Sequence, residues 1–457
     1  MIAPAGFLQE AVSENIIAGP AMLRRARYQF GMTLDHSCDG ELTSGLGPCP
    51  SLGTVSLIAP TIDVTHTGQE ITVGDVTMVF QLTPGTEAPA EMNFYLPGFR
   101  AVFMAENANL CMHNLLPARG ALVRDAKAWA DYLTEAIRLF GAGSDIMFAA
   151  HGIPRFGQHE IVAFLTSHRD AYKFLHDQTV RLMNTGLTAT EIAEVLKLPD
   201  VLAKQWFNRG YYGTMSHNSK AIYQRCLGWY DANPASLNPL PPEPAAKRYV
   251  AAMGGGEAVM ALAAKAEKEG ELRWAATLLN HAVFADATNK QAREQLAHIY
   301  TQLGYEAEAG TWRNIYLTGA QELRIGVAKL QPAAPNPDML SAMTTPMMLD
   351  IAAVRTDPVK ASERALKLNL VLSDVNETHL VTVENGVLIH ETGIHDDSAG
   401  ATVSLTRMEL VLTLLAGMPP EQFIKAGNIG IEGDATLYGV LTDMIEAPQP
   451  NFNIVEP

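Results

Sequence analysis

The first third of the chain carries short runs in which hydrophobic and polar residues alternate, a pattern typical of half-buried strands. A helix with one apolar face is expected over 7–30, and the order helix 125–140 then strand 145–149 indicates a βα unit. Gly74-Asp75 and Pro97-Gly98 predict the turns of two hairpins. The alternating runs predict strands at 54–58, 70–73, 76–82, 92–96 and 101–104.

From about residue 157 to 325 the apolar residues recur at helical spacing. Thr188-Ala189-Thr190-Glu191 has the order of a capping box, which marks a helix start. Two longer helices between 272 and 317 resemble a tetratricopeptide-like pair, which must pack on neighbouring helices or on a second subunit. The other candidate helices are 163–184, 188–196, 219–229, 244–253 and 256–269.

The last quarter of the chain returns to a mixture of helices and strands after a proline-rich linker at 331–337. Asn385-Gly386 between two β-rich runs is a strong hairpin signal. Helices are expected at 346–353, 406–416 and 419–424, and strands at 366–372, 379–383, 387–391 and 401–404. The chain is thus expected to contain an α/β domain at 1–165, an all-α domain at 166–327 and an α+β domain at 338–457.

Composition excludes several classes of protein. The chain has 457 residues, 47% of them hydrophobic, so more than one core is expected. Its net charge of −16 argues against a nucleic-acid partner. The sequence contains no run of about 18 uncharged apolar residues, so it predicts no membrane span. Glu10 and Glu14 break the apolar run that a signal peptide needs near its start, so no signal peptide is predicted. Bacterial periplasm and cytoplasm both remain as candidate compartments.

Two carboxylates and an imidazole follow predicted strands in the stretch 83–151. Glu87, Glu106 and His151 each come shortly after one of these strands. Loops that leave the carboxyl ends of strands converge on one crevice, so we expect the three side chains to meet. Glu oxygen with His nitrogen suits divalent metals. With 49 acidic residues and 13 histidines, however, such combinations also arise by chance.

The sequence segments around these residues indicate a protein family, which the three residues alone do not. Three segments, TPGTEAPAEMNFYLP, AENANLCMHNLLPARGALVRD and FAAHGIPRFG, resemble the second half of the catalytic domain of alkyl sulfatases in the metallo-β-lactamase superfamily. The similarity continues to the C-terminus. It implies the C-terminal half of an αββα sandwich, then a helical dimerisation domain, then a domain resembling sterol carrier protein type 2 that takes up alkyl chains in an apolar tunnel. An ordinary core explains the apolar faces of that last domain equally well.

The resemblance also assigns roles to residues. Glu87, Glu106 and His151 match three ligands of a site that holds two zinc ions per subunit, with Glu106 in the place of the bridging carboxylate. Asn114 and Arg119 match the groups that hold the sulfate. The implied activity is hydrolysis of detergent-like alkyl sulfates such as dodecyl sulfate by a homodimer, because zinc generates hydroxide near neutral pH and cationic groups neutralise the ester.

Two loops are expected to close on the same crevice. Loop 209–218 resembles a family segment that covers the substrate, and His217 within it is a candidate proton donor to the leaving alkoxide. The alternative for His217 is a surface histidine that caps the next helix together with Ser216. Loop 35–51, rich in Gly, Pro and Cys, is expected to lie over the crevice as well.

One motif of the family is absent from this sequence. The resemblance implies further metal ligands from an upstream His-x-His-x-Asp-His motif, but Asp35-His36 has Gly31 and Thr33 where histidines are expected. Met1-Ile2-Ala3-Pro4 already aligns inside the catalytic domain of the family. We therefore expect this chain to hold zinc weakly or as a single ion, and to hydrolyse alkyl sulfates poorly or not at all. We also expect an apolar face of its sheet to be left uncovered.

Three functional interpretations stay open at this point. The first is a zinc-dependent alkyl sulfatase. The second is a catalytically impaired fragment or pseudoenzyme that acts as a dimeric lipid-binding or alkyl-chain-binding protein. The third is another hydrolase of the superfamily, such as a lactonase or phosphodiesterase, against which Arg119 beside Asn114 argues.

Overall fold

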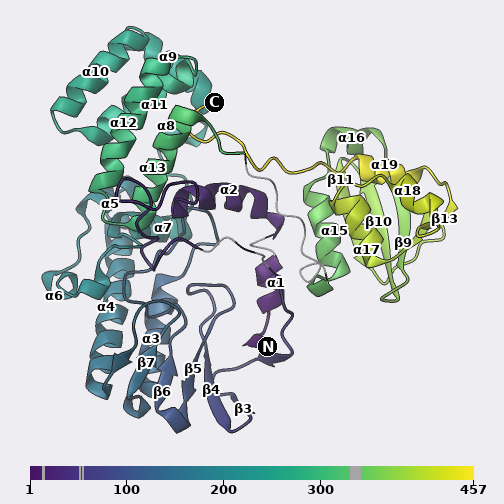
Figure 1. Ribbon diagram of the computed structural model, residues 1–457, viewed down its shortest axis with the longest axis horizontal. Coiled ribbons are helices and arrows are strands. Elements are labelled where there is room, and N and C mark those ends of the chain that lie inside the picture. The colour runs from purple at the N-terminus through teal and green to yellow at the C-terminus, as the bar shows by residue number, and fades with distance from the viewer. Residues whose placement is uncertain (13–15, 51–52, 54–55, 330–340) are drawn as a thin grey trace.

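The computed structural model describes residues 1–12, 16–50, 53, 56–329 and 341–457. Its ribbon (Figure 1) shows strands at the bottom, a bundle of helices above them, and a second sheet with its own helices to one side. We call these parts the N-terminal unit, residues 1–157, the helical unit, residues 158–329, and the C-terminal unit, residues 341–445. The domain boundaries expected from the sequence stay predictions.

A six-stranded sheet forms the centre of the N-terminal unit, in the order β3-β4-β5-β6-β7-β8. Neighbouring strands are antiparallel except β6 and β7, which are parallel and joined through helix α3. The two hairpins predicted from Gly74-Asp75 and Pro97-Gly98 are confirmed. The elements are β3 (Glu70–Val73), β4 (Val76–Leu82), β5 (Met92–Leu96), β6 (Ala101–Phe103), α3 (Ala126–Phe140), β7 (Ile146–Phe148) and β8 (Arg155–Phe156).

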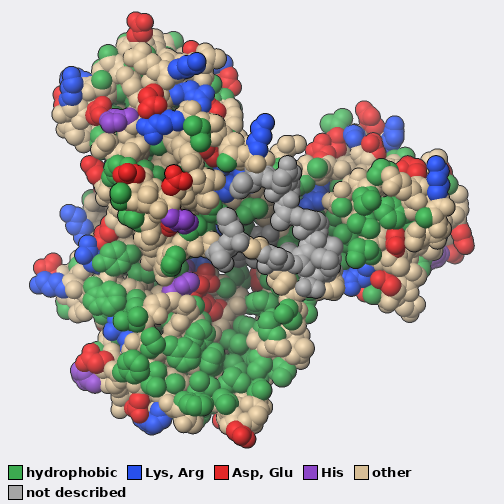
Figure 2. All heavy atoms as spheres, viewed as in Figure 1, with side chains coloured by type: hydrophobic (Ala, Val, Ile, Leu, Met, Phe, Trp, Pro, Cys, Tyr) green, Lys and Arg blue, Asp and Glu red, His purple; other side chains and the backbone are tan. Residues whose placement is uncertain are grey.

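The two faces of this sheet have different surroundings. Val102 and Met147 are paired across β6 and β7 and join the core formed with α3 and α4. On the opposite face Phe94, Phe103 and Phe148 form a row, with ring centroids 4.9 Å apart for the first pair and 5.1 Å for the second. These three rings are half-buried, and Figure 2 shows hydrophobic side chains gathered over the sheet. An incompletely covered apolar face was expected from the sequence.

The N-terminal segment differs from the single helix predicted over 7–30. Two helices form, α1 (Phe7–Val12) and α2 (Gly19–Phe30), and residues 13–15 between them lie outside the described residues. Pro20 explains the second start, because its ring suits the first turn of a helix and not its interior. Val12 of α1 joins the core of the C-terminal unit, so α1 and α2 serve different parts of the molecule.

The strand predicted at 54–58 is not found in the described residues of that range, 56–58, while 54–55 lie outside the described residues. Leu57 packs against the core of the C-terminal unit instead. Alternation predicts one buried side, but it does not tell which part of the molecule covers that side. A short parallel pair, β1 (Ile2–Pro4) with β2 (Ile62–Val64), was not predicted because each strand is too short to show a period.

The helical unit contains more helices than the sequence predicted. Between 272 and 317 three helices begin instead of two, and α10 to α13 share one core, so the expected pair packs on its neighbours. The capping box at Thr188 and Glu191 is confirmed. No helix among the described residues is long and apolar enough to cross a bilayer. The helices are α4 (Gln158–Met183), α5 (Ala189–Val195), α6 (Asp200–Ala203), α7 (Met215–Leu227), α8 (Pro234–Leu237), α9 (Pro242–Ala252), α10 (Gly256–Lys268), α11 (Leu272–Ala285), α12 (Lys290–Glu306) and α13 (Gly310–Ile325).

The C-terminal unit contains a five-stranded sheet in the order β11-β10-β9-β12-β13. The hairpin at Asn385-Gly386 is confirmed: both residues have positive φ, 54° and 82°, as a type I′ turn requires. The linker predicted at 331–337 lies outside the described residues. The elements are α15 (Thr345–Val354), α16 (Pro358–Glu363), β9 (Leu366–Leu372), β10 (Glu377–Glu384), β11 (Val387–Thr392), β12 (Ala401–Leu405), α17 (Arg407–Leu410), α18 (Pro420–Lys425), β13 (Gly430–Gly433) and α19 (Leu437–Asp443).

The last residues of the chain return to the helical unit, beside which the C-terminus lies in Figure 1. Arg24 Nε on α2 donates to the carbonyl of Phe452 at 2.8 Å, and Arg27 Nη1 donates to Asn451 Oδ1 at 2.9 Å. Val455 is buried in the core that α10 to α13 share. The tail therefore fills part of a core made by helices that lie far earlier in the sequence.

Candidate metal centre

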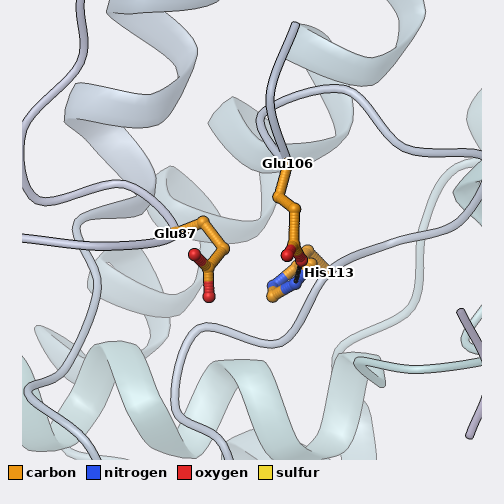
Figure 3. A group of neighbouring side chains, drawn as sticks. All are labelled: Glu87, Glu106 and His113. Atoms are coloured by element: carbon orange, nitrogen blue, oxygen red, sulfur yellow. Dashed lines mark hydrogen bonds and ion pairs between the residues drawn. The ribbon is translucent and has the colours of Figure 1, made fainter. Parts of the chain in front are cut away.

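The site is built on two loops of the N-terminal unit. Glu87 lies in the loop between β4 and β5, and Glu106 follows β6 directly after Ala105, whose φ of 44° turns the chain. His113 comes from the coil that leads toward α3. Figure 3 shows the Glu106 carboxylate against the His113 ring, with the Glu87 carboxylate beside them. One donor atom from each of Glu87, Glu106 and His113 lies within 4.8 Å of the others.

Glu106 connects two imidazoles. Its Oε2 lies 2.8 Å from His113 Nε2, and its Oε1 lies 3.3 Å from His151 Nε2. Glu87, Glu106 and His151 were expected from the sequence to meet: the structure places His151 against Glu106 and Glu87 near Glu106, and the roles of the three as metal ligands stay predictions. His113 was missed, although it stands in the same segment as Asn114. The sequence could have pointed to His113 only through its position between the candidates Glu106 and Asn114. A single histidine on a coil has no periodic pattern that would mark it as a ligand.

The electrostatics follow from these contacts. Burial alone would raise the pKa of Glu106, but hydrogen bonds from His113 and His151 outweigh burial and hold this pKa well below its usual range. The hydrogen bond to Glu106 raises the pKa of His151, against the opposing effect of burial. Glu106 is therefore ionised across the physiological range, which is the state in which a carboxylate binds a cation.

Arg124 is a buried cation beside this cluster and was not singled out in the sequence. Its Nη2 donates to Glu87 Oε1, and its Nη1 donates to the side-chain and backbone oxygens of Asn114, the latter at 2.8 Å. The same nitrogen lies 3.1 Å from His113 Nδ1. Arg124 thus fixes three groups of the site at once, and it leaves the second oxygen of Glu87 for another partner.

The two residues expected to hold sulfate occupy different positions. Asn114 is buried next to His113 and is bound by Arg124, so it lies in the cluster. The backbone N–H of Arg119 donates to Gln29 Oε1 at 2.8 Å, and its Nη1 contacts Met22 Sδ at 3.4 Å, both on α2. The sulfate-binding roles of Asn114 and Arg119 stay predictions.

His217 is half-buried, whereas the capping alternative requires a surface residue. Its Nε2 lies 2.5 Å from the carbonyl oxygen of Leu116, and burial lowers its pKa. The cap of α7 is Thr214, whose hydroxyl accepts from the His217 N–H at 2.9 Å, so the capping role assigned to Ser216 was wrong. The role of His217 as proton donor stays a prediction.

The loop that precedes α7 packs directly on the cluster. Gly213 N–H donates to the Met112 carbonyl at 2.9 Å, and the Tyr212 ring centroid lies 4.9 Å from that of His113. A Cβ at position 213 would lie 2.3 Å from the His113 carbonyl oxygen, so only glycine permits this approach. Loop 35–50 also reaches this region, since Cys111 Sγ contacts the Gly45 carbonyl at 3.7 Å.

The donor set fits a divalent metal. Two carboxylates and two imidazoles converge from loops that hydrogen bonds hold in place, and this mixture of oxygen and nitrogen suits zinc and other divalent ions of borderline softness. Glu87, Glu106, His113 and His151 are the residues that would hold such an ion. Among the described residues, Glu87, Glu106 and His113 are the three whose donor atoms all approach one another closely.

Comparisons with known proteins identify two family models in the later part of the chain and relatives that match all of it. Residues 188–326 match the family model described as alkyl sulfatase dimerisation, and residues 333–457 match the one described as alkyl sulfatase C-terminal. The chain is 45% identical to an alkyl/aryl-sulfatase of Saccharomyces cerevisiae, over all of this chain and 70% of that protein. It is 42% identical to a linear primary-alkylsulfatase of a Pseudomonas species, over all of this chain and 68% of that protein.

A solved structure gives the same result for the fold. The stereoselective inverting sec-alkylsulfatase of a Pseudomonas species superposes with a TM-score of 0.96 at 42% sequence identity. The match covers all of this chain and 72% of that chain. All three units, including the loops that carry Glu87, Glu106 and His151, thus have counterparts in one known enzyme.

Proposed function

This chain belongs to the alkyl sulfatase family, and from that premise we propose that it hydrolyses detergent-like alkyl sulfate esters, dodecyl sulfate among them. The ester and one water give the alcohol, sulfate and a proton. The observation that carries the proposal is the cluster of Glu106 with His113 and His151, held beside Arg124 and Asn114. The carboxylate and imidazoles of this cluster can bind a metal cation, and the adjacent guanidinium and amide can bind the sulfate anion.

We propose that zinc is the metal. Zinc would neutralise the ester and lower the pKa of a bound water to about 7, so that hydroxide is available at neutral pH. Glu87, Glu106, His113 and His151 would hold it. Arg124 keeps Glu87 aimed at the cluster through its bond to one carboxylate oxygen. Ligands that neighbouring groups orient in this way bind metal more tightly than ligands that move freely.

The chain's own residues also account for substrate orientation and proton transfer in the proposal. Asn114 and Arg119 would bind the sulfate oxygens through an amide and a guanidinium fork. His217 would donate a proton to the leaving alkoxide, which then departs as the alcohol. Because burial lowers the pKa of His217, its protonated form gives up the proton readily once it has left the Leu116 carbonyl.

We expect the purified chain to release sulfate from dodecyl sulfate slowly and only with a divalent metal. Ion chromatography of sulfate over time measures this directly. A chelator should stop the release and added zinc should restore it. Sulfate release that is unchanged by complete chelation would contradict a metal-dependent reaction. No release with zinc, cobalt or manganese would contradict the proposed activity itself.

We expect a homodimer that forms through the helical unit, because residues 188–326 match a dimerisation domain. Apolar side chains exposed on this unit include Trp229, with 71% of its surface exposed, and Trp274, with 53%. Light scattering at micromolar concentration should give twice the chain mass of 49.5 kDa. Trp229→Asp and Trp274→Asp test two exposed positions of the unit, and a variant that is monomeric places its tryptophan in the interface. A wild-type mass of 49.5 kDa would refute the dimer.

A further inference from the structure

Glu91 lies immediately before β5 and is 8% exposed. Its Oε2 accepts from Thr86 Oγ1 at 2.7 Å, from the Glu87 N–H at 2.8 Å and from the Ala88 N–H at 3.3 Å. Its Oε1 accepts from the Glu106 N–H at 3.1 Å. One carboxylate therefore holds the backbone of both candidate ligand loops, at the residues that carry the two candidate ligand carboxylates.

The position of these bonds matters for the cluster. A hydrogen bond at the backbone N–H fixes the position of the backbone from which the side chain extends. Glu91 therefore sets the separation of the Glu87 and Glu106 backbones and does not occupy the carboxylate of either residue. The Oε2 atom is surrounded by three donors and has no room to serve as a metal ligand itself. Glu91 thus differs from Glu87, Glu106 and His113, whose donor atoms lie within 4.8 Å of one another.

Both oxygens of Glu91 act as acceptors in the contacts that the described residues make to it. The four donors that the described residues supply to Glu91 are neutral amides and a hydroxyl. A buried carboxylate without a cationic partner costs free energy of folding. Departures of this kind from the rules of stable packing concentrate at functional sites. Other bonds brace the same loop, such as Asn107 Nδ2 to Thr83 Oγ1 at 3.0 Å, but they do not reach both ligand backbones.

We propose that Glu91 is a positioning residue for the metal centre, which acts by tying the Glu87 and Glu106 loops together through both of its carboxylate oxygens. This proposal rests on the proposed function, because it takes Glu87 and Glu106 as metal ligands. Glutamine at position 91 has the same size but only one acceptor oxygen, and its amide N–H₂ faces another N–H. One of the two loops therefore loses its anchor in Glu91→Gln.

The test compares Glu91→Gln with wild type in the full chain by two readouts. In the metal-free chain, hydrogen exchange resolved to residues 83–92 and 104–110 should be at least about tenfold faster at the Glu87 or Glu106 amide. In a Co²⁺ titration the dissociation constant should rise by about 10–100-fold, the range for groups that orient metal ligands. The visible Co²⁺ spectrum should change as well, which a loss of stability alone would not cause.

Glu322→Gln is the matched control. Glu322 is a carboxylate of similar burial, 5% exposed, that accepts from Arg24 Nη2 at 2.7 Å and from Tyr28 on α2, away from the ligand loops. It should lower thermal stability and leave Co²⁺ binding unchanged. Exchange and Co²⁺ binding of Glu91→Gln equal to wild type would overturn the proposal, as would the same changes in Glu322→Gln. A wild-type chain that binds no Co²⁺ would overturn the metal centre, and the exchange rates alone would then decide whether Glu91 ties the loops.

Discussion

Replacing Glu106 by glutamine is expected to remove metal binding and sulfate ester hydrolysis together. Glu106 lies 2.8 Å from His113 Nε2 and 3.3 Å from His151 Nε2, so it is the carboxylate shared by both imidazoles. Glutamine keeps the volume but loses the charge and one acceptor oxygen. Because a bound metal supplies several kcal/mol of transition-state stabilisation, turnover should fall by about 10³-fold or more.

The measurement is zinc content by elemental analysis, together with sulfate release from dodecyl sulfate. Glu135→Gln is the control, since the Glu135 side chain is 28% exposed, close to the 25% of Glu106, and accepts from Gln81 Nε2 on the sheet. The control should keep the zinc content and turnover of wild type. Full activity of Glu106→Gln after metal depletion would show that the reaction does not depend on this cluster.

The second large effect concerns stoichiometry: the 457-residue chain is expected to bind one zinc ion and not two. Catalytic zinc takes three protein ligands and keeps a position open for water. Two ions that share Glu106 would need five ligands, whereas the described cluster offers Glu87, Glu106, His113 and His151. Arg124 adds a positive charge at Glu87, which opposes a second cation there.

Elemental analysis after equilibrium dialysis at increasing free zinc should therefore level off near one equivalent per chain. Turnover of dodecyl sulfate should follow the occupancy of that single site and stay slow. Two equivalents of zinc per purified chain, with sustained turnover, would contradict this expectation. It would also mean that ligands beyond the four named here take part.

Much of the fold was predictable because it depends on local signals. The hairpins at Gly74-Asp75 and Asn385-Gly386 and the capping box at Thr188 follow from turn and cap chemistry within a few residues. The family and fold class expected from the sequence are confirmed by the match to a known alkylsulfatase. Two of the failures share a cause: Leu57 and α1 use their apolar residues against the C-terminal unit, hundreds of positions away.

The candidate site divides in the same way. Glu87, Glu106 and His151 were found because each stands after a predicted strand and because the surrounding segments resemble a family. His113, Arg124 and Glu91 were not found, since each lies on irregular backbone whose hydrogen bonds join distant residues. The bond from the Glu106 N–H to Glu91, for example, spans a hairpin whose register the sequence does not give.

The return of the tail to the helical unit has a consequence for the order of events during synthesis. The bond between Arg24 and the Phe452 carbonyl joins residues 428 positions apart, and Val455 fills a core of helices that leave the ribosome much earlier. Domains generally fold as they are made, from the N-terminus onward. The helical unit cannot complete its core until residues 452–455 have been translated, so its nascent helices must wait, with apolar surface exposed, while the whole C-terminal unit is synthesised.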